Sequence, residues 1–203
     1  MDAVLLRRVN RWQAQAVSGE LADLYVDSRE TSPREPYRPP GRQDFLNRLT
    51  TEIRRPRFAM VIAETDGLVG CAFGFPVRGD GLWWLGFEGA LPRGIEHLTE
   101  SGGVLAITDI LVRPHPRNQE DDVARRLQER LLTDHQASLG ATLVRRADHL
   151  VLAALRSWGW LDVGEIWRPI SATLLRVLVL PVGERTAARL EGLAHDAWTR
   201  WPG

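Results

Sequence analysis

The sequence predicts an α/β (α+β) fold, in which a mixed β-sheet is flanked by helices. A nearly unbroken apolar run, Val104–Val112, is typical of an interior strand that is covered on both faces. It leads through a turn rich in Pro and Arg into a segment, 123–132, whose apolar residues recur at helical spacing. Residues 58–64 and 68–75 predict an antiparallel hairpin across Thr65-Asp66-Gly67, because Asp-Gly strongly favours a tight turn. Alternation of helical and strand patterns indicates helices on the faces of a sheet.

Before the hairpin, the pattern predicts a strand over 4–9 and helices over 13–25 and 43–53. Residues 32–42, SPREPYRPPGR, are too dense in Pro and Arg for a regular element and predict a loop. After the hairpin, 79–94 mixes turn glycines with aromatic residues. Residues 95–102 are expected to form a mobile segment that leads into the central strand.

In the C-terminal half, strands are expected over 141–144, 162–166 and 171–180, with a helix over 150–158. The 203 residues suit one domain, with residues 184–203 as a C-terminal helical extension. One face of that extension is apolar and comprises Ala187, Leu190, Leu193, Ala194 and Ala197. This face packs either on the domain's own sheet or on a second copy, so monomer and homodimer both stay open.

Composition removes several classes of function. The chain has 26 basic and 26 acidic residues, so an overall field that attracts nucleic acid or an acidic membrane is not expected. Every basic residue is arginine, which excludes a Schiff-base lysine, a pyridoxal phosphate anchor and a Walker-type phosphate lysine. This bias is typical of a GC-rich bacterial genome.

Cysteine usage and the N-terminus bear on the compartment. Cys71 is the only cysteine, so neither an internal disulfide nor a cysteine-based metal site is expected, and it reads as a small buried hydrophobe. The first residues lack the apolar core of a signal peptide, and the apolar run 173–182 is interrupted by Arg176 and Pro181. A cytoplasmic protein without membrane partners is expected.

Asp109 is the unusual residue of the central strand. A carboxylate without a partner is costly to bury, so Asp109 is either hydrogen-bonded for structural reasons or directed into a functional cavity. In the second case it is the best candidate for a general base. His115 and His149 offer alternatives as proton shuttles, although a histidine in a loop or at a helix start is also typical of a solvated or capping residue.

The junction after the central strand resembles the central motif of the GNAT superfamily of N-acetyltransferases. In that motif a strand ending V-x-P is followed by Q/R-x-x-G-x-G/A, and here Gln119-Glu120-Asp121-Asp122-Val123-Ala124 occupies the second part. Downstream, 141–166 is similar to the family's strand, helix and G-F/W segment, and contains Ser157-Trp158-Gly159-Trp160. The resemblance covers residues 4–181. It implies a strongly twisted mixed sheet in which the central strand ends near Val112 and is splayed from the strand that begins at Ala141, with the main pocket in the cleft between them.

The resemblance also implies an activity, N-acyl transfer from acetyl-CoA or another acyl-CoA to a small-molecule amine acceptor. The backbone N–H groups near Leu111 and Val112 would polarise the thioester carbonyl, and Asp109 would take the proton of the amine. The expected coenzyme-binding residues are Leu111, Val112, Arg117, Gln119, Asp122, Val123, Ala124 and Arg125. Four aromatic residues fall in segments that flank the acceptor groove of the family, namely Tyr25, Tyr37, Trp83 and Trp84, with core packing as the alternative.

The chain departs from the family pattern where chemistry is expected. Asp122 stands in place of the motif's first glycine, Leu155 in place of a tyrosine acid, and Asp148 in place of an asparagine. Glu120, Asp121 and Asp122 put three carboxylates at the helix start, so we expect weakened binding of the coenzyme A pyrophosphate. The alternative function is a GNAT-fold protein that has lost acetyl-CoA turnover and binds a ligand or serves a repurposed reaction of specialised metabolism.

Overall fold

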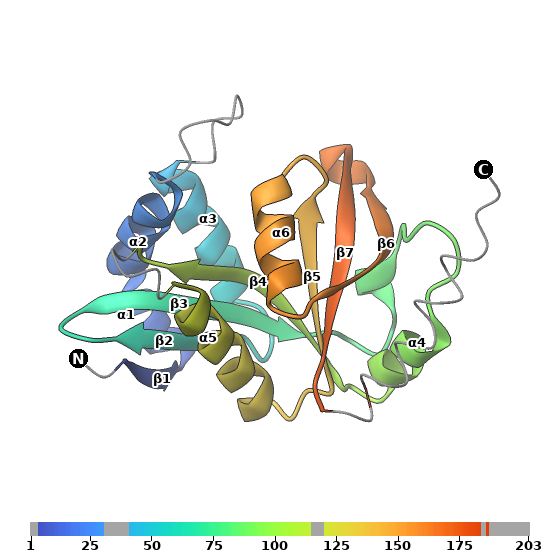
Figure 1. Ribbon diagram of the computed structural model, residues 1–203, viewed down its shortest axis with the longest axis horizontal. Coiled ribbons are helices and arrows are strands. Elements are labelled where there is room, and N and C mark those ends of the chain that lie inside the picture. Colours follow the sequence, from blue (N-terminus) through green and yellow to red (C-terminus); the bar gives the residue numbers. More distant parts are fainter. Residues whose placement is uncertain (1–3, 31–40, 115–119, 184–185, 187–203) are drawn as a thin grey trace. The chain divides into compact units, whose positions relative to one another are not determined.

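A computed structural model describes residues 4–30, 41–114, 120–183 and 186 of the chain (Figure 1). These residues belong to two compact units. Unit 1 comprises the described residues up to Phe75 together with Ile107–Thr133, and unit 2 comprises Pro76–Ala106 and the described residues from Asp134 onward. The apolar face predicted for the C-terminal extension and the loop predicted over most of 32–42 lie outside the described residues.

The predicted strands and most of the predicted helices are present along the chain (Figure 1). In order they are β1 (Leu5–Val9), α1 (Arg11–Ala16), α2 (Ser18–Glu30), α3 (Arg42–Ile53), β2 (Ala59–Glu64), β3 (Leu68–Pro76), the 3-10 turn η1 (Leu82–Trp84), α4 (Arg93–Glu100), β4 (Val104–Val112), α5 (Glu120–Asp134), β5 (Leu139–Arg145), α6 (His149–Ser157), β6 (Leu161–Arg168), the 3-10 turn η2 (Pro169–Ser171) and β7 (Thr173–Pro181). Hydrogen bonding orders the strands β1-β2-β3-β4-β5-β7-β6. The predicted mixed sheet flanked by helices is therefore confirmed.

Unit 1 is built on the hairpin of β2 and β3. The two strands are antiparallel, and β1 pairs antiparallel with β2, which confirms the predicted hairpin across Asp66-Gly67. Alternate strand residues face opposite sides of a sheet. One side, with Met60, Ile62 and Cys71, joins the core formed with the helices α1–α3.

The other side of β3 lies against α5 at Gly70. A Cβ atom built there would lie 3.0 Å from Leu127 Cδ1 and 3.3 Å from Val123 Cγ1. Glycine therefore allows the apolar stripe of α5 to pack closely on the strand. Unit 1 thus has helices on both faces of its strands, which explains why its strand sequences are almost continuously apolar.

Unit 2 contains the remaining strands and makes the sheet mixed. β5 pairs parallel with β4 over Val104–Ala106 and antiparallel with β7 along its whole length, and β7 pairs antiparallel with β6. The parallel register covers three residue pairs, and β4 continues from Ile107 as a strand of unit 1. Partial pairing of the two central strands agrees with the predicted splaying.

Three predicted elements differ in detail. The helix expected over 13–25 is two helices, because α1 ends at Ala16 and the weak helix formers Ser18 and Gly19 begin the next one. The prediction of a mobile segment over 95–102 is wrong, because residues up to Glu100 form α4. Within this helix, Thr99 accepts a tertiary hydrogen bond from Trp84. The last strand begins at Thr173 because η2 precedes it.

None of the described helices combines the length and the continuous apolar sequence that a membrane span requires.

Candidate functional site

Asp109 lies on β4 in unit 1, with its carboxylate next to α3. Its Oδ1 accepts a hydrogen bond of 3.1 Å from Nη2 of Arg48, and its side chain is only 7 % exposed. The structure therefore gives Asp109 a hydrogen-bonded charge partner, which the structural one of its two predicted roles requires. The ion pair suits a structural role, and it also leaves a carboxylate on the central strand that can accept a proton.

Two aromatic rings hold the guanidinium of Arg48. Its Cζ lies 5.8 Å from the ring centre of Tyr25 on α2 and 5.6 Å from that of Phe45 on α3. The two rings are buried and stack with centroids 4.5 Å apart and planes inclined by 19°. A cation beside aromatic faces is attracted by the electron-rich π-system, so the rings help to fix the guanidinium beside Asp109.

These four residues, Tyr25, Phe45, Arg48 and Asp109, are called the Asp109 cluster below. Sequence reasoning found Asp109 and Tyr25, and the structure brings both to the same guanidinium. It missed Arg48 and Phe45. Their spacing of three places them on one side of a helix, which is a weak indication, but Arg48 is 61 residues from Asp109 and only the tertiary structure joins them.

Cys71 on β3 lies close enough to Asp109 to respond to its charge. The pKa of the buried Cys71 thiol is raised well above its ordinary value, first by desolvation and then by the carboxylate of Asp109, while a hydrogen bond with the Leu111 backbone lowers it. The thiol therefore stays protonated at neutral pH and is no nucleophile. This confirms the interpretation of Cys71 as a small buried hydrophobe. The roles of the Leu111 and Val112 N–H groups toward a thioester remain predictions.

The start of α5 carries four of the residues expected to bind the coenzyme. Val123 and Ala124 turn their side chains into the core of unit 1, so only their backbone is left to contact a ligand. Arg125 is exposed, and the side chain of Asp122 is 73 % exposed, with its Oδ2 3.9 Å from Nη1 of Arg126. The other two residues of the expected loop, numbers 117 and 119, lie outside the described residues.

No protein-family model and no curated protein sequence matches the chain. Solved structures do match it. The aminoglycoside acetyltransferase AAC(6')-Ib in complex with coenzyme A is 18 % identical with a TM-score of 0.56, over 88 % of this chain and 95 % of its own. An acetyltransferase from Thermus thermophilus is 16 % identical with a TM-score of 0.57, over 90 % of this chain and 100 % of its own.

A third match is a putative acetyltransferase of the GNAT family from Desulfovibrio desulfuricans. It is 14 % identical with a TM-score of 0.57, over 89 % of this chain and 100 % of its own. The chain has the fold of the GNAT acetyltransferases. The fold implied by the sequence resemblance is thereby confirmed.

Within this GNAT fold, two of the residues that depart from the family pattern, Asp148 and Leu155, have structural roles. Asp148 caps α6 by accepting a hydrogen bond of 3.2 Å from the N–H of Val151. Leu155, at the place of the tyrosine acid, packs in the interior and carries no proton to transfer. His149 is exposed at the start of α6, while His115 lies outside the described residues. Asp109 therefore remains the strongest candidate for acid–base chemistry in the described chain.

The tryptophans expected near an acceptor lie in η1 of unit 2. Trp84 is 5 % exposed and its Nε1 donates to Thr99 Oγ1 at 2.9 Å, which is the core-packing alternative of the two roles. Trp83 packs edge-on against Trp84, and its carbonyl accepts a 2.6 Å hydrogen bond from Arg168. Burial lowers the pKa of the Arg168 guanidinium. Tyr37 lies outside the described residues.

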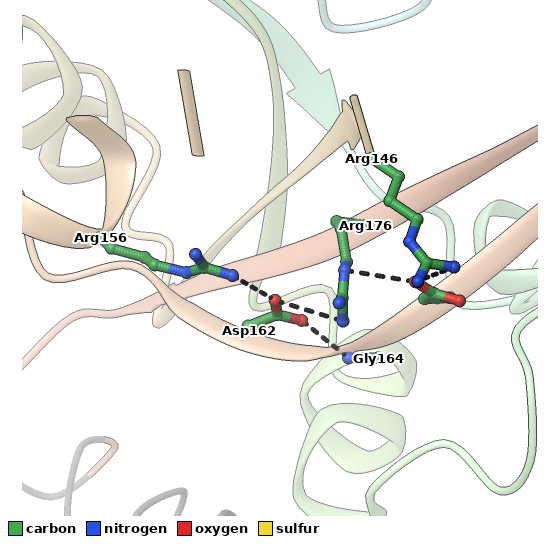
Figure 2. Close-up of polar contacts among 6 residues, drawn as sticks. Arg146, Arg156, Asp162, Gly164 and Arg176 are labelled. Atoms are coloured by element: carbon green, nitrogen blue, oxygen red, sulfur yellow. Dashed lines mark hydrogen bonds and ion pairs between the residues drawn. The ribbon is translucent and has the colours of Figure 1, made fainter. Parts of the chain in front are cut away.

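Unit 2 also contains an alternating chain of ion pairs (Figure 2). Asp162 on β6 contacts Arg156 of α6 at 2.9 Å and Arg176 of β7 at 3.5 Å. Arg176 also lies 3.2 Å from Glu165, whose other partner is Arg146 at 3.8 Å. Arg176 thus joins both carboxylates and stabilises the β6–β7 hairpin.

We expect Arg176→Met to lower the free energy of unfolding by about 1 kcal/mol, since it removes two ion pairs of a partly exposed network. Arg156→Met removes one ion pair and is the matched control, for which we expect a smaller loss of unfolding free energy. Chemical denaturation at low and high salt measures both, and salt should reduce the difference. A loss in Arg156→Met as large as in Arg176→Met would contradict the central position of Arg176.

Proposed function

We propose that this chain is an acyl-CoA-dependent N-acyltransferase that acts on a small amine. The observation that carries the proposal is Asp109, an almost buried carboxylate beside a cation on the central strand of a GNAT fold. Similar structures support it by their names. AAC(6')-Ib is an aminoglycoside acetyltransferase, and a Vibrio cholerae SpeG chimera with hSSAT, 9 % identical with a TM-score of 0.54, is a spermidine N-acetyltransferase.

In the proposed reaction, the amine nitrogen attacks the thioester carbonyl carbon, a C–N bond forms, and the C–S bond breaks. Asp109 accepts the proton that the amine loses, and that proton then neutralises the departing thiolate. Backbone N–H groups at Leu111 and Val112 would stabilise the negative oxygen of the intermediate. The start of α5 would hold the pyrophosphate through backbone N–H groups, with Arg125 as an exposed positive charge nearby.

Calorimetric titration tests the donor first. Coenzyme A and acetyl-CoA are expected to bind with a stoichiometry of about one, and mixing acetyl-CoA with small amines is expected to release a free thiol at a rate that saturates with the amine. Absence of heat with both nucleotides, together with no thiol release, would overturn the proposal.

The acidic start of α5 gives a specific expectation for the affinity. Replacing Glu120 and Asp122 together by glycine should lower the dissociation constant of coenzyme A about tenfold, because two carboxylates no longer oppose the pyrophosphate. A larger gain is not expected, since Asp122 is 73 % exposed and solvent screens its charge. Calorimetry of both proteins measures the change.

Glu129→Gly is the control, because Glu129 is an exposed acid farther along the same helix and should leave the affinity unchanged. Tight binding by the unmodified chain with no gain in the double variant would show that the acidic helix start is no obstacle.

The same acidic start favours the alternative function, a ligand-binding or repurposed protein of GNAT fold. Its three first-turn carboxylates suit the helix dipole without any bound anion. Coenzyme A binding that remains absent in the glycine double variant would support this alternative.

A further inference from the structure

The Asp109 cluster contains a feature that acid–base chemistry alone does not require, a fixed positive charge beside the base. The guanidinium of Arg48 and the carboxylate of Asp109 form a pair of opposite charges 3.1 Å apart. We propose that this pair recognises an α-amino-carboxylate acceptor, whose carboxylate binds Arg48 while its amine faces Asp109. This inference rests on the proposed function and names its substrate class.

The donors of Arg48 support a ligand with a carboxylate. A guanidinium presents several N–H groups in a planar fork that matches a carboxylate. The one hydrogen bond that it makes to another described residue uses Nη2, and its side chain is 44 % exposed. Other N–H groups of the fork are therefore available to a molecule that arrives from solvent.

The surroundings of Arg48 indicate that it stays in place when an acceptor binds. The rings of Tyr25 and Phe45 lie beside the guanidinium, and Phe45 is on the same helix. Moving Arg48 away would break an ion pair with an almost buried carboxylate and lose both aromatic contacts. Arg48 is therefore a fixed part of the binding site.

Charge complementarity then selects among amines. In an α-amino acid the amine and the carboxylate are joined through one carbon, so both groups can lie side by side across the pair of Asp109 and Arg48. A diamine or polyamine brings a second cation close to Arg48, which repels it and offers no acceptor. The cluster thus favours zwitterionic over polycationic acceptors.

The test compares L-phenylalanine with 2-phenylethylamine, its counterpart without the carboxylate, using acetyl-CoA and the intact chain. In the unmodified protein we expect kcat/KM to be at least about tenfold higher for the amino acid. Arg48→Met should reduce this ratio at least about tenfold, mainly through the KM of the amino acid, and Arg48→Lys should restore part of it.

Arg42→Met is the matched control. Arg42 lies on the same helix, is 48 % exposed and is paired with Asp23, so its removal should leave the preference unchanged. Equal kcat/KM values for both acceptors, or a ratio that Arg48→Met leaves intact, would overturn the inference while the proposed acyl transfer stands.

If neither acceptor is acetylated, the proposed function fails for these amines, and binding decides the inference separately. Calorimetric titration of L-phenylalanine should then show binding that Arg48→Met weakens at least about tenfold. No binding to the unmodified chain, or equal binding by both proteins, would overturn the inference.

Discussion

Asp109→Asn is expected to lower kcat for acyl transfer about a hundred- to ten-thousandfold, because it removes the group that accepts the proton of the amine. Asparagine keeps an oxygen at the place of Oδ1, so Arg48 retains a hydrogen-bond acceptor and the Asp109 cluster should stay assembled. The binding of coenzyme A should therefore change little. Thiol release under saturating acetyl-CoA and amine measures the fall in kcat.

Asp27→Asn is the control for this experiment. Asp27 is also a carboxylate of unit 1 in an ion pair, 3.2 Å from Arg113, but its side chain is 43 % exposed. Its replacement should leave kcat within about threefold. A value of kcat in Asp109→Asn that matches this control would contradict the role of Asp109 as base.

Phe45→Ala is expected to lower the free energy of unfolding by about 3–5 kcal/mol, which is the usual cost of removing a buried aromatic side chain. Phe45 is fully buried, stacks on Tyr25 at 4.5 Å and meets Phe73 edge-on at 6.4 Å. The cavity would open where α3 packs on the strands of unit 1. Denaturation by urea, followed by circular dichroism, measures the loss.

Trp12→Ala provides the comparison, because Trp12 is aromatic but 73 % exposed. Its replacement should change the free energy of unfolding by less than about 0.5 kcal/mol. A loss below about 1 kcal/mol in Phe45→Ala would show that the stacked rings are not central to the core of unit 1.

The order of the strands and of most helices was predictable because each of them has a local pattern. The bounds of β4 agree with the predicted strand, and α3 and the hairpin differ from their predictions by a residue or two. The error at α4 has a physical cause. Its helix is short, and Ile95 and Thr99 on its buried side are spaced by four, a helical spacing that the turn glycines on either side of the segment obscured.

The candidate site was also predictable only in part. Asp109 stood out in the sequence because a charged residue in an apolar strand must have a compensating partner or a function. The sequence could not identify that partner, because Arg48 comes from a helix far away along the chain. Likewise, Trp83 and Trp84 are adjacent in the sequence and have the same neighbouring residues. Only the hydrogen bond with Thr99 in the folded chain distinguishes the buried indole of Trp84 from that of Trp83.

The strands, most of the helices, the carboxylate in the central strand and the acidic start of α5 could be predicted, since these features depend on neighbouring residues along the chain. Which charges meet could not, because it depends on how distant segments pack. Arg48 reaches Asp109 because α3 packs on the face of unit 1 where Asp109 lies. Arg176 joins Asp162 and Glu165 because β6 and β7 pair antiparallel with a register shift between Asp162 and Gly164, which brings both carboxylates to the same arginine. Such contacts depend on long-range packing, for which no local pattern exists.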